Sequence, residues 1–150
     1  MRTRGWARAI ATVGIVVSLD QATKQAAVSG IDRGERVNVF LGIDLTNTRN
    51  TGVAFGALEG GGLLIALLIG AALALLVGYF ALNAERRWLW LPVGLLLGGA
   101  LGNLADRARI GAVIDFIDPI AWPAFNLADA AIVLGVLGLL YVIEGPPGRS

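Results

Sequence analysis

Four long apolar stretches restrict this chain to a membrane fold. They run from about residues 6 to 27, 60 to 84, 88 to 105 and 125 to 143. Each is close to the ~20 residues that a helix needs to cross the hydrocarbon core of a bilayer. Hydrophobic residues make up 56% of the chain and charged residues only 15%. This composition is typical of a membrane protein and not of a water-soluble globular protein. We therefore predict a membrane all-α protein: one domain, residues 1–150, built as a bundle of four transmembrane helices.

The first apolar stretch follows a basic start, as the core of a cleavable signal peptide also does. However, it continues into Asp20 and Lys24, and no small-residue cleavage site follows. We expect a retained first helix with a polar outer end.

Arginine placement predicts the orientation of the four helices. The short turn Glu85–Arg87 joins the second and third stretches as an antiparallel pair. Four crossings put both chain ends on one side of the bilayer, together with six of the 12 basic residues. The count is therefore equal on the two sides, and the positive-inside rule gives no majority. The arginines at the N-terminus and in the turn favour two cytoplasmic ends, with the loop of residues 28–60 outside.

The outer loop contains one predicted strand. In residues 37–45, VNVFLGIDL, every second residue is valine, leucine or isoleucine, which is the period-two pattern of a strand. The polar segment at residues 47–52, NTRNTG, is typical of a turn. We expect a small β-sheet that lies on the outer surface of the membrane.

The third apolar stretch carries two rows of residues at the helical spacing of four. A row of small residues permits close helix approach, and a row of polar residues would gather at the outer end of the helix. The first row is Gly94, Gly98 and Gly102; the second is Gly99, Asn103 and Arg107, with Asp106 beside it.

Two aspartates are the strongest candidates for chemistry. Asp115 and Asp129 stand in apolar surroundings on either side of a short re-entrant segment. A carboxylate inside a bilayer costs about 2.5–3.5 kcal/mol, so it usually faces a partner or water. Two carboxylates within ~3 Å share one proton, so one can activate a water while the other polarises a carbonyl. The alternative for each aspartate is a helix cap or a packing ion pair.

Asp118 competes with Asp115 for this role. We prefer Asp115 because its neighbours, Ile114 and Phe116, are both apolar. The chain has no cysteine and no histidine, which excludes thiol nucleophiles, Ser–His catalysis and zinc sites built on those residues. We expect neither a metal nor a cofactor.

The other polar residues have simpler interpretations. Asp20 and Lys24 lie at a spacing of four, and an ion pair of that kind on a helix surface is worth a few tenths of a kcal/mol. Arg107 is either a snorkelling residue at a helix end or the counter-charge of Asp106 or of a substrate carbonyl. Asn50 is a turn residue by default, and a role in clamping a substrate backbone is a hypothesis.

Five sequence blocks resemble those of the bacterial lipoprotein signal peptidases, also called signal peptidase II. No block is specific alone, but five in order together with four apolar stretches are. The blocks are DQATK at Asp20–Lys24, NTGVAFG at Asn50–Gly56, GGALGNLADR at Gly98–Arg107, VIDFID at Val113–Asp118 and FNLADAAI at Phe125–Ile132.

The resemblance implies an intramembrane aspartyl endopeptidase. Such an enzyme would remove the signal peptide of a prolipoprotein by cutting just before a cysteine that carries a diacylglyceryl group. Its expected partners are prolipoproteins and membrane lipids rather than nucleic acid, and the cyclic peptide globomycin is its expected inhibitor. It would work in the bacterial cytoplasmic (inner) membrane, with its active site near the outer face.

The resemblance also implies roles for residues. The catalytic pair of the family falls on Asp115 and Asp129. Val53 and Ala105 depart from the family, which more often has alanine and isoleucine there, and this affects only local packing and substrate fit. Supporting and substrate-binding roles fall on Asp20, Lys24, Asn50, Gly52, Asn103, Asp106, Arg107 and Asn126.

Two functions of other classes stay open at this point. A small proton-coupled transporter or channel could relay protons through buried aspartates. Against it, the charged residues gather at one membrane face, and no inverted repeat relates the two halves. A non-catalytic membrane scaffold would leave the acid pair without a role.

Overall fold

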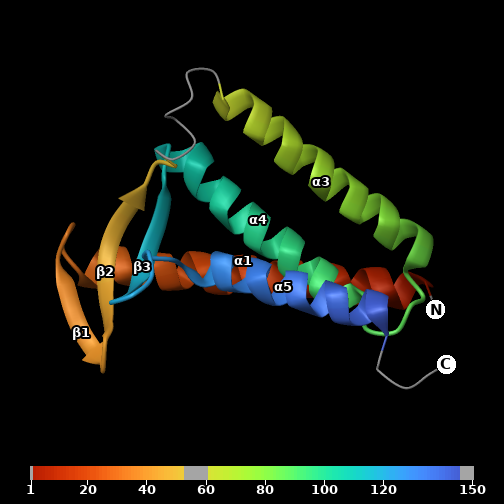
Figure 1. Ribbon diagram of the computed structural model, residues 1–150, viewed down its shortest axis with the longest axis horizontal. Helices are drawn as coiled ribbons and strands as arrows, with labels where there is room; N and C mark the ends of the chain where they lie inside the picture. The colour runs from red at the N-terminus through yellow and green to blue at the C-terminus, as the bar shows by residue number, and fades with distance from the viewer. Residues whose placement is uncertain (1, 53–60, 146–150) are drawn as a thin grey trace.

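The chain forms four long helices and a three-stranded sheet within residues 2–52 and 61–145, which the computed structural model describes (Figure 1). Val53 and the rest of the predicted outer loop, up to residue 60, lie outside the described residues. The elements are α1 (Arg2–Gly30), β1 (Arg36–Phe40), β2 (Ile43–Asn50), α3 (Gly61–Asn83), α4 (Trp90–Ile110), β3 (Val113–Pro119) and α5 (Leu127–Glu144).

All four predicted apolar stretches are helical, and two of the helices are longer than predicted. α1 extends beyond the predicted stretch at both ends, through residues 2–5 and 28–30; of these residues only the two arginines at the start are strong helix formers. α4 continues to Ile110, and Gly111 ends it in the left-handed conformation, at φ 70°. Among the described residues, α5 alone is long and apolar enough to qualify as a membrane span, and α3 contains a shorter apolar helix. The helices are therefore confirmed, whereas four membrane crossings stay a prediction.

The single strand predicted at residues 37–45 is wrong, because that segment is a hairpin. β1 ends at Phe40, and β2 begins at Ile43 and pairs with β1 in antiparallel fashion. Gly42 lies in the turn at φ 77°, a conformation that glycine adopts without strain. Because a two-residue turn does not interrupt a period of two, the apolar alternation continues through the turn and hides it.

Two further parts of the sheet were not predicted. The segment NTRN, predicted as a turn, belongs to β2, and the predicted re-entrant segment contains β3, which pairs with β2. The polar side chains of β2 are tolerated because backbone carbonyls accept their hydrogen bonds: Thr46 donates to Glu35, and Asn47 donates to Ile31. The sheet order is β1-β2-β3, so the buried strand β3 lies at one edge, against the helices.

Helices α1, α4 and α5 pack closely through glycine, as the glycine row predicted. A Cβ added to Gly98 would lie 2.7 Å from the Cβ of Val16 on α1. On the neighbouring face of α4, a Cβ on Gly99 would meet the backbone of Ala128 on α5. The backbones of α1 and α5 therefore approach α4 to distances that any larger residue would prevent.

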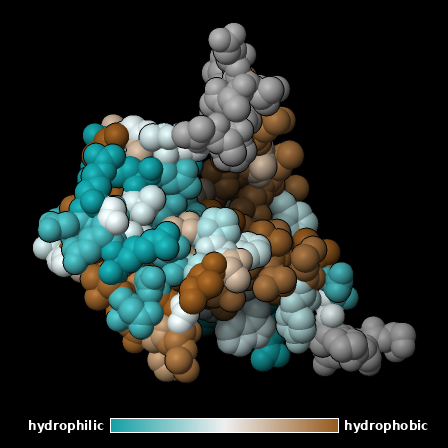
Figure 2. Space-filling model, turned by 60° about the vertical axis from the view of Figure 1, so that its left-hand side comes forward, coloured by the Kyte–Doolittle hydropathy of each residue, from teal (hydrophilic) through white to brown (hydrophobic). Residues whose placement is uncertain are grey.

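α3 diverges from the other three helices along most of its length (Figure 1). Its C-terminal part packs through Phe80, which is 1% exposed and makes an edge-to-face contact with Trp6, with ring centres 4.8 Å apart. Toward the N-terminus of α3, Leu67 and Leu75 are more than half exposed. Hydrophobic residues cover the helical part of the surface and hydrophilic residues gather over the sheet end (Figure 2). This division fits helices in lipid and a sheet at the membrane surface.

Candidate active site

Asp115 and Asp129 meet where the sheet joins the helices. Asp115 lies in the middle of β3 and is 2% exposed, and Asp129 lies in the first turn of α5. Asn126 caps α5 between them: its side chain accepts a hydrogen bond from the Asp129 amide, at 3.0 Å. In return, Oδ2 of Asp129 accepts from the backbone N–H of Asn126, at 3.2 Å. Asp129 therefore takes part in a helix cap and also keeps its second oxygen for another partner.

The side chain of Asn126 joins the two carboxylates. Its Nδ2 donates to Oδ1 of Asp115 at 2.8 Å and to Oδ1 of Asn103 at 3.1 Å. Asn103 in turn donates from its Nδ2 to Oδ1 of Asp129, at 2.8 Å. Because Asn126 is completely buried, this chain of amides has no water to compete with it and holds both acids in one orientation.

Asn50 holds the other oxygen of Asp115. Its Nδ2 donates to Oδ2 of Asp115 at 3.0 Å, and its Oδ1 accepts from the amide of Gly52 at 2.9 Å. Gly52 has φ 69°, a left-handed conformation that suits glycine. The sequence predicted Asn50 as a turn residue; it does make a turn contact, but from the end of β2 its side chain also reaches the candidate site.

The pKa of the Asp115 carboxyl is raised above its ordinary value. Burial is the largest cause, since it disfavours the charged form, and the nearby Asp129 carboxylate adds to it. Hydrogen bonds from Asn50 and Asn126 oppose the rise. Asp115 is therefore suited to hold a proton at this site.

Lys24 lies behind this pair, in a buried network. Its Nζ is 2.8 Å from Oδ2 of Asp20 and 2.8 Å from Oδ2 of Asp106, and it donates to Oδ1 of Asn103 at 3.0 Å. Lys24 is only 1% exposed. The predicted ion pair between Asp20 and Lys24 is present, but it is buried, so the expected value of a few tenths of a kcal/mol, which holds for exposed pairs, does not apply.

The two aspartates of this network connect four elements. Oδ1 of Asp20, on α1, accepts from the amide of Ala128 in the first turn of α5, at 2.9 Å. Oδ2 of Asp106, on α4, accepts from the amide of Ile114 in β3, at 3.2 Å. The network thereby fixes the β3 and α5 segments that carry the two candidate catalytic acids.

Arg107 does not act as the counter-charge of Asp106. Its side chain is exposed and makes no hydrogen bond or ion pair with the described residues, whereas Lys24 and Arg109 contact Asp106. In an α-helix, Arg107 lies about 100° around the axis from Asp106, while Arg109, three residues on, shares its face. A role toward substrate stays a prediction for Arg107.

The sequence analysis also missed Gln21, whose amide donates to Asp20, Asp106 and the carbonyl of Gly102. Its position inside the DQATK block was the available signal. Asp118, the competitor of Asp115, lies on the opposite side of β3 and pairs with Arg36 at 2.9 Å.

The candidate site of the described residues thus contains two carboxylates, three asparagines and a buried lysine network. No group of three or more histidine, cysteine, aspartate or glutamate side chains in the described ranges is arranged to hold a metal ion. The arrangement holds two carboxyl groups in one hydrogen-bonded network, with a raised pKa at Asp115, which suits acid–base chemistry.

Comparisons with known proteins agree on one family. The chain matches the family described as signal peptidase (SPase) II over residues 12–144. It is 42% identical over 140 residues to the lipoprotein signal peptidase of Pelotomaculum thermopropionicum, with 92% of each chain covered. It is 39% identical over 138 residues to that of Moorella thermoacetica, covering 91% of this chain and 92% of the relative. The fold is similar to that of a bacterial membrane enzyme solved by the in meso method at 1.9 Å resolution: the TM-score is 0.78 and the identity 32%, over 90% of this chain and 91% of that one.

Proposed function

Because the chain belongs to the signal peptidase II family, we propose that it is a bacterial membrane peptidase that removes signal peptides from prolipoproteins. The relatives at 42% and 39% identity are both named lipoprotein signal peptidase. The comparisons do not support the proton-coupled transporter that the sequence left open. A non-catalytic scaffold would leave the acid pair without a role, whereas the proposed peptidase gives it one.

The proposed chemistry is that of an aspartyl endopeptidase. The observation that carries it is the buried Asn126, which contacts both Asp115 and Asp129 and holds them in one site. Asp115 carries the shared proton, in agreement with its raised pKa. Asp129 is the ionised partner, and the positive end of the α5 dipole favours its negative charge.

Peptide hydrolysis at this pair would proceed through a bound water. Asp129 takes a proton from the water, and the water oxygen attacks the carbonyl carbon of the scissile bond. Asp115 gives its proton to the carbonyl oxygen, which stabilises the tetrahedral intermediate. The intermediate then collapses: the C–N bond breaks, the departing amine takes the proton held by Asp129, and a hydroxyl of the intermediate returns a proton to Asp115 as the C=O bond re-forms, which restores the starting state of the pair. Neither aspartate forms a covalent bond with the substrate.

The finer features of the substrate and of the location belong to the same proposal. The scissile bond lies just before a cysteine with a diacylglyceryl group, and the acyl chains hold the substrate in the bilayer. Four helices cross the inner membrane, both ends are cytoplasmic, and the acid pair is near the outer face. Globomycin is the expected inhibitor.

The deciding experiment is cleavage of a lipid-modified precursor peptide by the purified protein in detergent, followed by mass spectrometry of the products. We expect one cut before the modified cysteine, blocked by globomycin and insensitive to metal chelators and to serine or cysteine protease reagents. A precursor without the lipid is the matched control and is expected to be cut poorly. No cleavage by folded protein, or equal cleavage by the Asp115→Asn variant, would contradict the proposal.

A further inference from the structure

A pocket lined by arginines and tryptophans lies at the end of the molecule opposite the acid pair. It is formed by the start of α1 and the turn between α3 and α4, and its volume is about 410 Å³. A single carboxylate, Glu85, lines it. The other charged residues of the lining are Arg4, Arg8, Arg86 and Arg87, and Trp88 and Trp90 line it as well. The pocket therefore carries a large excess of positive charge.

The floor of the pocket is rigid backbone. Gly5 of α1 is buried directly against Ala84 in the turn, and a Cβ on Gly5 would collide with the carbonyl oxygen of Ala84. This close approach brings the arginines of α1 beside those of the turn. The charge cluster is thus a product of packing between segments about 80 residues apart in the sequence, not of sequence adjacency.

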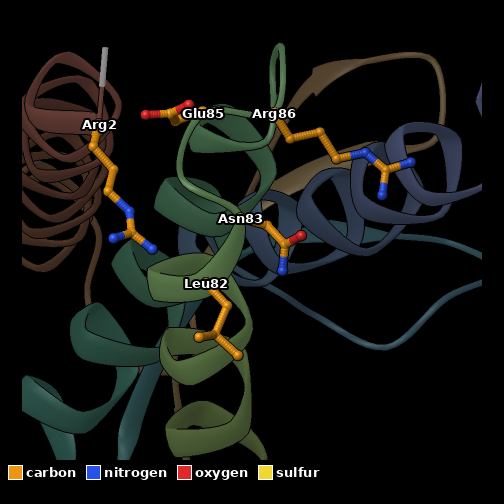
Figure 3. Close-up of a pocket in the computed structure, with 5 residues that line it drawn as sticks. All are labelled: Arg2, Leu82, Asn83, Glu85 and Arg86. Carbon is orange, nitrogen blue, oxygen red and sulfur yellow. The ribbon is translucent and has the colours of Figure 1, made fainter.

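A neighbouring cavity is lined by two arginines that already have hydrogen-bond partners within the protein (Figure 3). There the Arg2 side chain donates to the carbonyl of Ala81, at 2.9 Å, and so caps the C-terminal end of α3. Arg86 extends toward α5 (Figure 3) and donates to the carbonyls of Val142 and Ile143. Both guanidinium groups already satisfy the negative ends of helices.

Arg4, Arg8 and Arg87 differ from Arg2 and Arg86 in their surroundings. None of them takes part in the ion pairs found among the described residues, and all three are exposed. Moreover, α1 has no acidic residue in its first turn, so Arg4 adds positive charge to the positive end of the helix dipole. A bound anion would relieve this electrostatic mismatch.

The tryptophans indicate the depth at which the pocket lies. Their rings are 5.9 Å apart, and the Arg8 guanidinium carbon is 5.8 Å from the centre of the Trp90 ring. Trp88 has φ 67°, which is rare for a bulky residue, and the residue is 53% exposed. Tryptophan is enriched at the level of lipid headgroups, so two tryptophans beside an arginine cluster fit a pocket at the depth of the phosphodiesters.

We propose that this pocket binds the phosphodiester headgroup of an anionic phospholipid. The arginines supply the charge that such headgroups attract at a membrane surface, and the tryptophans provide an apolar wall toward the lipid. A free phosphate shares the same chemistry but gains nothing from that wall. The proposal goes beyond peptide hydrolysis, because no step of the reaction uses this end of the molecule.

The test is a binding titration of the purified full chain in a neutral detergent. Short-chain phosphatidylglycerol is added in one arm, short-chain phosphatidylcholine in the second, and inorganic phosphate in the third, with binding followed by native mass spectrometry. We expect phosphatidylglycerol to bind at concentrations at which the other two do not. The combined variant Arg4→Gln, Arg87→Gln should weaken that binding by about 25-fold, about fivefold for each arginine.

The matched control is Arg33→Gln, which removes an exposed arginine at the sheet end and should leave binding unchanged. Unchanged melting and unchanged cleavage in lipid-free detergent would show that the double variant is folded. Equal binding of phosphatidylglycerol and phosphatidylcholine would overturn the proposal, and so would full binding by the double variant. Phosphate binding as tight as that of phosphatidylglycerol would assign the pocket to a free anion and overturn the lipid assignment. Binding is measured without substrate, so this test can fail while the proposed peptidase function stands.

Discussion

The two ends of helix α1 hold positive charge in opposite ways. Near the sheet, Lys24 is 1% exposed, and each of its three N–H bonds has an oxygen partner. At the start of the same helix, Arg4 and Arg8 are exposed and have no carboxylate partner among the described residues.

The difference follows from the cost of removing a charge from water. A buried charge must have its partners within the protein, so Lys24 organises the elements around it. An exposed charge keeps its hydration and stays available to bind a partner outside the protein, which we propose is a lipid headgroup. One end of α1 therefore shapes a site, and the other end is suited to respond to lipid.

The first prediction asks whether the two ends lie on opposite sides of the membrane, and its outcome is all or none. A reporter fused at Glu85 should be in the cytoplasm, because the arginines of this end favour that side. A reporter inserted near Gly34, in the outer loop, should be outside. A Gly34 reporter found inside the cell would contradict the proposed topology, because the two ends of α1 would then not lie on opposite sides of the membrane.

The acid pair beside the Lys24 network should give the largest loss of rate. Asp115→Asn and Asp129→Asn should each lower the cleavage rate by at least about 10²–10⁴, the usual scale for an acid or base. Both variants should fold, since asparagine keeps the size and one hydrogen-bonding oxygen of aspartate. The control Asp118→Asn should lose far less, because Asp118 pairs with Arg36 outside the site. Near-normal cleavage by either variant of the pair would refute the catalytic assignment.

Substitution of the two kinds of cation should affect stability very differently. Lys24→Ala leaves Asp20 and Asp106 buried without their cation, so the free energy of unfolding should fall by about 3–5 kcal/mol. Arg4→Ala should change it by no more than about 0.5 kcal/mol. Thermal unfolding in neutral detergent measures both, together with the yield of folded protein.

The Lys24→Ala variant also distinguishes a structural role of Lys24 from a direct role in the reaction. Activity of Lys24→Ala should be reduced mainly through the amount of folded protein. If cleavage is abolished while the melting temperature is unchanged, Lys24 has a direct role in the reaction, and its assignment as a positioning residue is wrong.

The packing of the middle of α1 against α4 can be tested with glycine-to-alanine substitutions. Gly98→Ala would place a Cβ 2.7 Å from Val16, so we expect the free energy of unfolding to fall by about 1–3 kcal/mol. Gly14→Ala is the control within α1, since its Cβ would meet no atom within 4 Å. That variant should be neutral or slightly stabilising, because alanine favours a helix over glycine. Equal destabilisation by both variants would argue against close packing of α1 on α4.

The smallest expected effect is a pH dependence of stability from Asp115. Its pKa is raised in the folded protein, so between the ordinary value of 3.8 and the raised value the folded state binds more protons than the unfolded state. This contribution to stability is present at low pH and is lost as the pH rises through the raised pKa. Melting temperatures of the wild type and Asp115→Asn, compared from about pH 4 to about pH 8, should differ in slope over that range. Parallel curves would show that Asp115 ionises as it does in the unfolded chain.

Local sequence patterns determined the helices and the identity of the candidate site. The length of an uninterrupted apolar run is a local property, so the four helices could be predicted from it. The residue blocks likewise predicted the family, which the comparisons confirm. The two aspartates could be chosen for their apolar neighbours alone, although their catalytic role stays a prediction.

Tertiary structure decided how these residues meet. The hairpin turn at Gly42 and the pairing of β2 with β3 depend on partners elsewhere in the chain, which a period of two does not reveal. The Asp20 carboxylate accepts from Ala128, 108 residues away, and this long-range contact is part of what turned a seemingly exposed ion pair into a buried network. Whether a charge is buried depends on which elements cover it, and that is a property of the whole fold. For this reason the sequence identified the charged residues, and only the packing separated the buried cation, Lys24, from the cations that stay exposed.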